Sequence, residues 1–329
     1  MKYSTKCVRV DRKVVLDNAC GKNSNYIYSR YDNVNREELE TTIADLYNNK
    51  AVCYCLTSGM TCLMFLQQKY HDKYFLVDAH VHSEAEELLR KIHGSKIIVR
   101  DFRNIDELRK AIKQNSIVLL DSLSNPLGFA YDIQAISEMA HKFQCMVVVD
   151  NTMLTSYNCN PFDYGADVVL ESLSKYGCGH GDCLGGALLC NDDISCEVAL
   201  MGLNITPFNA WLIRRGLATL PLRMERINHT TAAIAEWLKQ RSEVLGYDVR
   251  AGIIVFSCGS NYKHQKFIKA LDLIRYSFSF GQDNTLISNC INNVDNIACM
   301  RLCIGLEDPE DLINDLGRGF LQCEVKPCK

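Results

Sequence analysis

Four stretches of the chain place residues that can do chemistry directly after apolar runs. Lys175 stands in "DVVLESLSKYGCGHGD", between serines and a glycine-histidine-glycine turn. Asp150 ends "VVVD", Asn125 lies in "SNP", and Ser58 and Gly59 follow "CYCLT". Each alone is weak evidence, because lysines are usually solvated, a strand-end aspartate is often a cap and Asn-Pro often marks a turn.

The joint placement of these residues is more informative. Ligand-binding groups gather at the carboxyl ends of the strands in parallel α/β sheets. Ser58, Gly59 and Met60 open a helix and can offer backbone N–H groups to a phosphate. Ser172 and Ser174 add hydroxyls beside the lysine. An anion cradle, hydroxyls, a buried carboxylate and a lysine are what pyridoxal 5'-phosphate (PLP) requires, since it needs a Schiff-base amine, an acid for its ring nitrogen and a phosphate cup.

The elements that must position these residues alternate between helix and strand from residue 36 onward. Short apolar runs predict strands at 73–79, 96–101, 116–123, 145–152, 166–173 and 183–190. Amphipathic patterns predict helices at 36–49, 84–94, 105–115 and 132–144. This alternation predicts a mostly parallel sheet covered by helices on both faces.

The pattern changes after a long helical stretch at 207–241. Strands are predicted at 252–258 and 299–305, and helices at 264–274 and 309–320. We therefore expect a large α/β domain over 41–218 and a smaller C-terminal α+β domain over 219–329, with residues 1–40 preceding them.

Composition bounds the classes of function. The chain has 329 residues, 47% hydrophobic and 23% charged, and a net charge of −3 without a basic block, which disfavours nucleic acid as a partner. The first twenty residues contain no apolar core of a signal peptide, and no uncharged run approaches the ~20 residues that span a bilayer. We expect a cytoplasmic protein with no membrane partner.

The 17 cysteines read as reduced thiols that act as small core hydrophobes. The pairs Cys53/Cys55, Cys299/Cys303 and Cys323/Cys328 lack the spacing of paired zinc knuckles. His80 and His82 flank one valine and would share a strand face, but two ligands alone do not define a metal site. The sequence predicts no metal.

The chain resembles the Cys/Met-metabolism family of PLP-dependent enzymes, which includes cystathionine γ-lyase, cystathionine β-lyase, methionine γ-lyase and cystathionine γ-synthase. The family pattern around its lysine is met by "DVVLESLSKYGCGHGD". Further matches run in order at 28–30 (YSR), 58–60 (SGM), 124–126 (SNP), 147–152 (VVVDNT), 215–224 (RGLATLPLRM) and 301–313 (RLCIGLEDPEDLI). The resemblance implies a fold-type I PLP-enzyme-like large domain and a smaller C-terminal domain.

The resemblance also implies roles by position in the cofactor site. Lys175 would form the Schiff base and move the α-proton, and Asp150 would pair with the pyridine nitrogen. Asn125 would approach the ring hydroxyl and the substrate. Ser172 and Ser174, with Ser58 and the backbone of Gly59 and Met60, would hold the phosphate.

Other implied roles concern substrate and assembly. Tyr28 and Arg30 would reach the phosphate of a neighbouring subunit from the arm at 1–40, so the resemblance implies a homo-oligomer, either a dimer or a tetramer, with shared sites. Arg301 would clamp the substrate α-carboxylate, with Ser279 nearby.

One departure from the family pattern concerns the tyrosine that stacks on the cofactor. Here "DAHVHSE" places His80 at that position, with His82 as the alternative. An imidazole can stack and can also act as an acid or base near neutral pH.

The expected reaction is β- or γ-elimination from a sulfur-containing or O-activated amino acid by a C–S lyase. One alternative is γ- or β-replacement, as in cystathionine γ-synthase or a sulfhydrylase. An alternative of another class is a catalytically silent PLP-binding scaffold.

Overall fold

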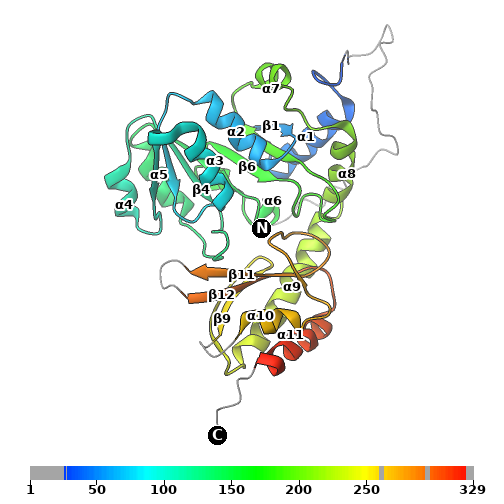
Figure 1. The fold of residues 1–329 in the computed structure, drawn as a ribbon. Coiled ribbons are helices and arrows are strands. Elements are labelled where there is room, and N and C mark those ends of the chain that lie inside the picture. The colour runs from blue at the N-terminus through cyan, green and yellow to red at the C-terminus, as the bar shows by residue number, and fades with distance from the viewer. Residues whose placement is uncertain (1–25, 27, 259–262, 293–296, 324–329) are drawn as a thin grey trace. The chain divides into compact units, whose positions relative to one another are not determined.

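The protein is described here by a computed structural model that covers residues 26, 28–258, 263–292 and 297–323 (Figure 1). The chain divides into two compact units. Unit 1 contains the described residues up to Asn125 and the segment Ala130–Leu220, and unit 2 contains Pro126–Phe129 and the described residues from Pro221 onward. The domain boundaries drawn from the sequence stay predictions, and most of the predicted arm at 1–40 lies outside the described residues.

Unit 1 is built on a seven-stranded sheet in the order β1-β7-β6-β5-β4-β2-β3. The strands are β1 (Val52–Leu56), β2 (Phe75–Asp78), β3 (Ile97–Arg100), β4 (Ile117–Asp121), β5 (Met146–Asp150), β6 (Val168–Ser172) and β7 (Gly186–Cys190). Neighbours from β6 to β3 are parallel, whereas β7 is antiparallel to both β1 and β6. The carboxyl ends of six strands therefore lie along one edge, which also holds the first residue of β7.

Helices cover this sheet, as the alternating pattern predicts (Figure 1). They are α1 (Val34–Leu46), α2 (Gly59–Lys69), α3 (Ser83–His93), α4 (Ile105–Ala111), α5 (Ile133–His141), α6 (Thr155–Asn158), α7 (Ser195–Met201) and α8 (Pro207–Leu217), with short 3₁₀ turns η1 (Gly94–Lys96) and η2 (Pro161–Tyr164). Every residue of β2, β4 and β7 is buried. Strands covered on both faces need apolar residues at consecutive positions, which explains their continuous apolar runs.

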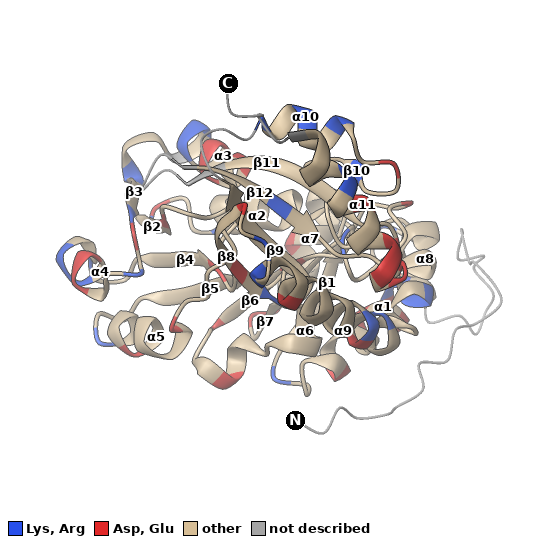
Figure 2. Cartoon of the chain, turned by 90° about the horizontal axis from the view of Figure 1, so that it is seen from below, with Lys and Arg blue, Asp and Glu red and all other residues tan. Residues whose placement is uncertain are grey.

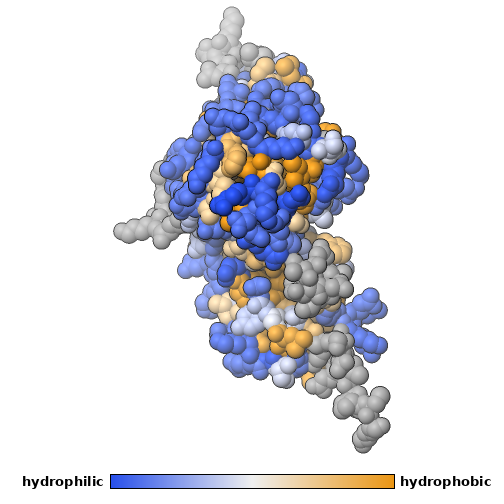
Figure 3. All heavy atoms as spheres, turned by 90° about the vertical axis from the view of Figure 1, so that its left-hand side faces the viewer, coloured by the Kyte–Doolittle hydropathy of each residue, from blue (hydrophilic) through white to orange (hydrophobic). Residues whose placement is uncertain are grey.

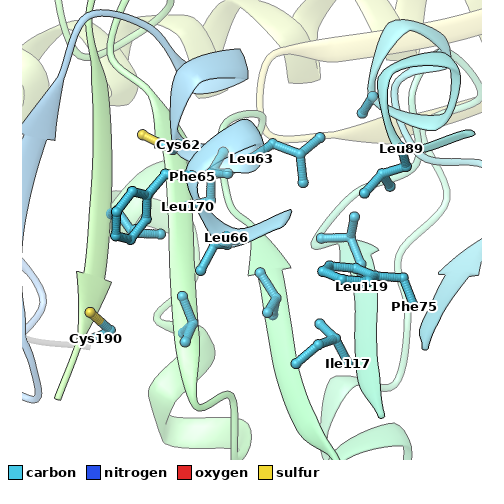
Figure 4. Packing of buried hydrophobic residues seen from close by; sticks show 14 of the residues in the cluster. Cys62, Leu63, Phe65, Leu66, Phe75, Leu89, Ile117, Leu119, Leu170 and Cys190 are labelled. Carbon is cyan, nitrogen blue, oxygen red and sulfur yellow. The ribbon is translucent and has the colours of Figure 1, made fainter. Parts of the chain in front are cut away.

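An apolar core of unit 1 lies between α2 and the sheet (Figure 4). Phe65 and Leu66 of α2 pack with Leu170 of β6 and Cys190 of β7 in this core, and all four are at least 94% buried. Burying a large apolar side chain contributes about 1.5 to 3 kcal/mol. This packing holds the first turn of α2 in place at the carboxyl edge of the sheet.

Unit 2 has a five-stranded sheet in the order β10-β11-β12-β9-β8. Its elements are α9 (Leu220–Lys239), β8 (Val244–Arg250), β9 (Ile253–Cys258), α10 (His264–Lys269), β10 (Arg275–Tyr276), β11 (Leu286–Asn292), β12 (Ile297–Cys303) and α11 (Pro309–Cys323). The rings of Phe267 and Phe320 pack edge to face, with 4.9 Å between their centroids, and link α10 to α11. The unit is an α+β fold, as the sequence predicts.

Three sequence predictions differ from the structure in detail. The helical stretch at 207–241 is two helices, with Pro207 and Pro221 each in a first turn, where the missing N–H is not needed. The helix predicted at 264–274 ends at Lys269. The ranges predicted as strands do not include β1, β8, β10 or β11. β8 is exposed over most of its length, so its residues lack the apolar alternation that marks a half-buried strand.

Charged residues of both signs are interspersed on the outer helices, for example on α4 (Figure 2). The face that bears α4 and α5 is mainly hydrophilic, with hydrophobic residues showing between the polar ones (Figure 3). Among the described residues, no helix combines the length and the apolar character that a membrane crossing requires.

Candidate active site

The first turn of α2 lies against the ends of two strands, and two glycines allow this approach. Ser58 caps the helix, and its Oγ accepts a hydrogen bond from the Thr61 N–H at 3.1 Å. A Cβ added at Gly59 would stand 3.0 Å from the Ser172 Cβ, and one added at Gly186 would stand 2.3 Å from the Ser58 carbonyl oxygen. A side chain at either position would push the turn away, so the glycines keep the N–H groups of α2 beside Ser172.

A hydrogen-bonded chain joins the ends of β5 and β6. The Asp150 Oδ1 accepts hydrogen bonds from the Thr152 N–H, at 2.9 Å, and from the Thr152 hydroxyl. The same hydroxyl oxygen accepts a hydrogen bond from the Ser172 N–H at 2.8 Å. Thr152 thus orients the carboxylate, although it was not among the predicted site residues. A hydroxyl two residues after a strand-end aspartate is the signal that would have found it.

Asp150 lies beside a second buried acid. Asp121 of β4 is its register partner, and the Asp121 Oδ2 accepts a hydrogen bond from the His82 N–H at 3.2 Å. Burial raises the pKa of the Asp150 carboxyl, an effect that the Thr152 hydrogen bonds and the charge of His82 oppose. Burial, followed by the charges of Asp150 and Asp78, raises the pKa of Asp121 well above its ordinary value. Burial therefore disfavours the charged form of both carboxyls at this edge of the sheet.

Lys175 lies in a half-buried turn that follows β6. Its N–H donates to the Ser172 carbonyl at 3.2 Å, and its carbonyl accepts from the Gly179 N–H at 2.8 Å. The Ser174 Oγ accepts from the Gly185 N–H at 3.1 Å and donates to the Gly185 carbonyl at 3.3 Å. The turn therefore ties the lysine to Ser172, and it ties Ser174 to the segment that leads into β7.

The two histidines after β2 interact with different acids. The His80 Nε2 lies 3.6 Å from the Asp101 Oδ2, and this imidazole is 9% exposed. The His80 carbonyl accepts a hydrogen bond from the Asn125 N–H at 3.2 Å, which brings the predicted Asn125 to the same edge of the sheet. The charge of His82, by contrast, acts on Asp150.

Tyr28 and Arg30 lie outside the sheet edge in this chain. The Arg30 guanidinium donates to the Ala199 carbonyl at 2.8 Å and stacks over the rings of Tyr28 and Tyr31. Tyr28 is 52% exposed. The predicted contact of these two residues with a neighbouring subunit stays a prediction.

In unit 2, Arg301 and Ser279 lie together. Arg301 belongs to the central strand β12 and is 3% exposed. Its Nη2 donates to the Phe278 carbonyl at 2.6 Å and reaches the Ser279 carbonyl at 3.5 Å, and the guanidinium stands 5.6 Å from the centre of the Phe280 ring. Arg301 is therefore not a surface strand residue.

Comparison with known proteins identifies the family to which the chain is similar. A sequence model of the family described as Cys/Met metabolism PLP-dependent enzyme matches residues 4–248. Cystathionine gamma-synthase of Haemophilus influenzae is 30% identical over 91% of this chain and 88% of its own length. L-methionine gamma-lyase of Porphyromonas gingivalis is 29% identical over 91% of this chain and 86% of its own length.

One solved structure with a similar fold contains a pyridoxyl group bound to a lysine. It is that of a putative O-acetylhomoserine (thiol)-lyase from Campylobacter jejuni with N'-pyridoxyl-lysine-5'-monophosphate. Its TM-score to this chain is 0.81 with 25% identity, and the match covers 89% of this chain and 87% of that one. A lysine joined to the pyridoxyl group thus occurs in a protein with this fold.

Proposed function

We propose, from the premise that this chain belongs to the Cys/Met metabolism family of PLP-dependent enzymes, that it is a lyase that cleaves the C–S bond of a sulfur-containing amino acid. The reaction would be a β- or γ-elimination that releases a thiol, a keto acid and ammonia.

The observation that carries this proposal is the arrangement at the carboxyl edge of the sheet. The Asp150–Thr152–Ser172 hydrogen-bond chain, the glycine-permitted approach of α2 and the turn that bears Lys175 all belong to three adjoining elements of unit 1. They fit PLP, because the cradle between Gly59 and Ser172 is bounded by helix N–H groups that suit a phosphate. The buried carboxylate at Asp150 suits a protonated ring nitrogen.

Each residue then has a defined task. Bound PLP supplies an aldehyde and a ring that accepts the electrons released at Cα. Lys175 would offer its amine to bound PLP and would carry the proton from the substrate Cα. Asp150, oriented by Thr152, holds the proton on the ring nitrogen. The N–H groups of Gly59 and Met60, with the hydroxyls of Ser58, Ser172 and Ser174, bind the phosphate, while Asn125 approaches the ring.

Substrate recognition and assembly extend this proposal. Arg301 would bind the α-carboxylate of an amino acid with Ser279 beside it, and its burial supports a strong charge-assisted contact. Tyr28 and Arg30 would complete the phosphate site of a second copy in a homo-oligomer. Since the cysteines described in the structure are free thiols, the cytoplasm is the compartment that suits this protein.

The two histidines are both candidates for the stacking and proton-transfer role. His80 occupies the predicted position and its imidazole is held toward Asp101. His82 is supported by the effect of its charge on Asp150. Replacing each separately with phenylalanine keeps a ring and removes the titratable nitrogens, so the variant that loses turnover while still binding PLP identifies the acting residue.

A product analysis tests the proposed reaction. The PLP-loaded protein is incubated with cystathionine, methionine or O-acetylhomoserine, with and without an added thiol. We expect keto acid and ammonia in equal amounts, lost in Lys175→Ala and retained in the exposed-lysine control Lys142→Ala. A new amino acid without ammonia would instead support γ- or β-replacement, which the similarity to a cystathionine gamma-synthase keeps as the second candidate. PLP binding without either product would leave the scaffold alternative.

A further inference from the structure

The loop that follows Lys175 gathers two thiols and a carboxylate. The Cys178 Sγ, the Cys183 Sγ and a carboxylate oxygen of Asp182 all lie within 4.8 Å of one another. We propose that these three residues bind a soft divalent cation of the zinc type and so fasten the loop that carries the lysine. The sequence predicted no metal: the cysteine pairs weighed there were Cys53/Cys55, Cys299/Cys303 and Cys323/Cys328, and Cys178 was not considered together with Cys183 and Asp182.

The backbone of this loop brings the donors together. Gly179 and Gly181 have φ angles of 78° and 68°, values that glycine adopts without strain, and they reverse the chain between Cys178 and Asp182. Without these two glycines the carboxylate and the second thiol would not return to the first thiol.

The position of Cys178 is fixed from several sides. Its N–H donates to the Leu173 carbonyl at 2.8 Å, and its carbonyl accepts from the His180 Nδ1 at 2.7 Å. A Cβ at Gly216 of α8 would stand 2.1 Å from the Cys178 carbonyl oxygen, so α8 packs directly against this residue. One ligand is thus held rigidly before a cation arrives, which lowers the entropic cost of binding.

The donor spacing suits a tetrahedral ion. The Cys178 S–H donates to the Asp182 Oδ1 at 2.9 Å. Zinc bonds of about 2.3 Å to sulfur and about 2.1 Å to oxygen place two donors on one ion roughly 3.3 to 3.8 Å apart. The atoms, which lie within 4.8 Å of one another, need to shift by about 1 Å or less to reach that spacing. When the thiols lose their protons, the three groups carry like charges that a divalent cation neutralises.

Two soft thiolates with one carboxylate favour zinc over magnesium or calcium, which prefer oxygen ligands. Asp182 is exposed and Cys183 is partly exposed, so the remaining coordination position faces solvent and would take water. The Gly179 N–H also bonds to the Lys175 carbonyl, so an ion held one residue away at Cys178 would stabilise the turn that presents the lysine.

Oxidation of the two thiols to a disulfide is the main competing explanation. Exchange with a disulfide oxidant requires an accessible thiolate. Cys178 is 1% exposed, so of the pair only Cys183 offers an appreciable surface for attack. Attack by Cys183 on an oxidant, followed by displacement by the neighbouring Cys178, would still give the disulfide. The two explanations are therefore separated by the chemical state of the purified protein, which is reduced and metal-bound in one case and disulfide-bonded in the other.

Metal analysis of the full-length, PLP-loaded protein tests this proposal. After dialysis against metal-free buffer with a non-thiol reductant, ZnCl₂ is added and the bound zinc is counted. The same protein titrated with Co²⁺ is followed by its sulfur-to-cobalt absorption. We expect about one equivalent of zinc that is lost in Cys183→Ser, with affinity reduced by about 100-fold or more, and weakened in Asp182→Asn. Cys196→Ser, which removes an exposed free cysteine of α7, is the matched control and should keep the zinc.

The same variants give a readout that does not depend on turnover. Excess Zn²⁺ should raise the melting temperature of the wild type and of Cys196→Ser, but not that of Cys183→Ser, because a ligand that binds only the folded state stabilises it. Equal zinc content in the wild type and Cys183→Ser would overturn the proposal, and so would a Cys178–Cys183 disulfide found by peptide mass in the purified protein before any oxidant is added.

Discussion

Asp150, a half-buried aspartate of unit 1, and Asp315, a fully buried aspartate of unit 2, differ in how the surrounding groups stabilise the charged carboxylate. Within the described residues, the hydrogen bonds accepted by the Asp150 carboxyl both end on Oδ1 and both come from Thr152. Burial is the main cause that raises its pKa. Its carboxylate is therefore held at a cost to the folded state.

Asp315 of α11 is fully satisfied. Its Oδ1 accepts from the Asp272 N–H at 2.9 Å and from the Arg318 Nη2 at 2.6 Å, and its Oδ2 accepts from the N–H groups of Leu273 and Ile274. Burial alone would raise the pKa of this carboxyl, but these hydrogen bonds outweigh burial and lower it. Asp315 thus stabilises the connection between α10 and β10.

The difference separates a structural acid from a site acid. A carboxylate surrounded by backbone donors contributes to stability and has no capacity left for a ligand. One that is buried with few donors is stabilised only when a cation or a proton arrives, which is the condition expected of a group that binds a protonated ring nitrogen.

The largest expected effect is on activity, in Asp150→Asn. The asparagine oxygen can still accept hydrogen bonds from Thr152. The free energy of unfolding without PLP should therefore change by about 1 kcal/mol or less. Turnover of the PLP-loaded enzyme should fall about 1,000-fold, because a neutral amide cannot hold a proton on the ring nitrogen. Steady-state kinetics at saturating PLP measures this. Turnover within threefold of the wild type would remove Asp150 from the cofactor site.

For Asp315→Asn we expect a loss of stability without a loss of turnover. Whichever way the amide turns, its NH₂ group faces backbone N–H donors, so we expect a loss of about 3 kcal/mol in the free energy of unfolding. Turnover per folded molecule should be unchanged. Urea unfolding and kinetics below the unfolding transition measure the two quantities, and a loss of turnover without destabilisation would contradict the comparison.

The stability lost in Asp315→Asn should depend on pH in a defined direction. Because the folded-state pKa of Asp315 is lowered, its stabilising effect is present above the unfolded pKa of about 3.9 and fades as the pH falls through the folded value. The wild type and Asp315→Asn should therefore converge in stability in acid.

At Glu171 of β6 we expect a smaller change, in which the substitution increases the free energy of unfolding. Burial raises the pKa of Glu171 to about 7, although the Tyr47 hydroxyl donates to its Oε2 at 2.7 Å. A raised carboxyl pKa means that its stabilising effect is full below the unfolded pKa of about 4.3 and is lost as the pH rises to about 7. Glu171→Gln should gain roughly 2 kcal/mol over the wild type between pH 5 and pH 8. Unfolding of both PLP-free proteins across this range measures it, and parallel curves would show that Glu171 does not titrate there.

Much of the fold followed from local pattern. Continuous apolar runs predicted β2 to β7, because a strand covered on both faces needs apolar side chains at every position. The exposed strand β8 has no such run, and the break between α8 and α9 is confined to a few residues near Pro221, so both escaped prediction. Asp150 was predicted from its place at a strand end, and Ser58 and Gly59 from their place at the start of a helix after an apolar run.

Most of the helices and strands of unit 1, the family motifs and the residue types at the strand ends could be read from the sequence, because these depend on neighbours along the chain. Only the tertiary structure decided which groups meet across strands: Thr152 with Ser172, Asp121 with Asp150, and Cys178 with Cys183. These contacts join residues on different strands or across a glycine turn, and the electrostatic field at Asp150 is a sum over such contacts. Neither the contacts nor the electrostatic field at Asp150 can be predicted from neighbours along the chain, because burial and the distances between charges are set only when the chain has folded.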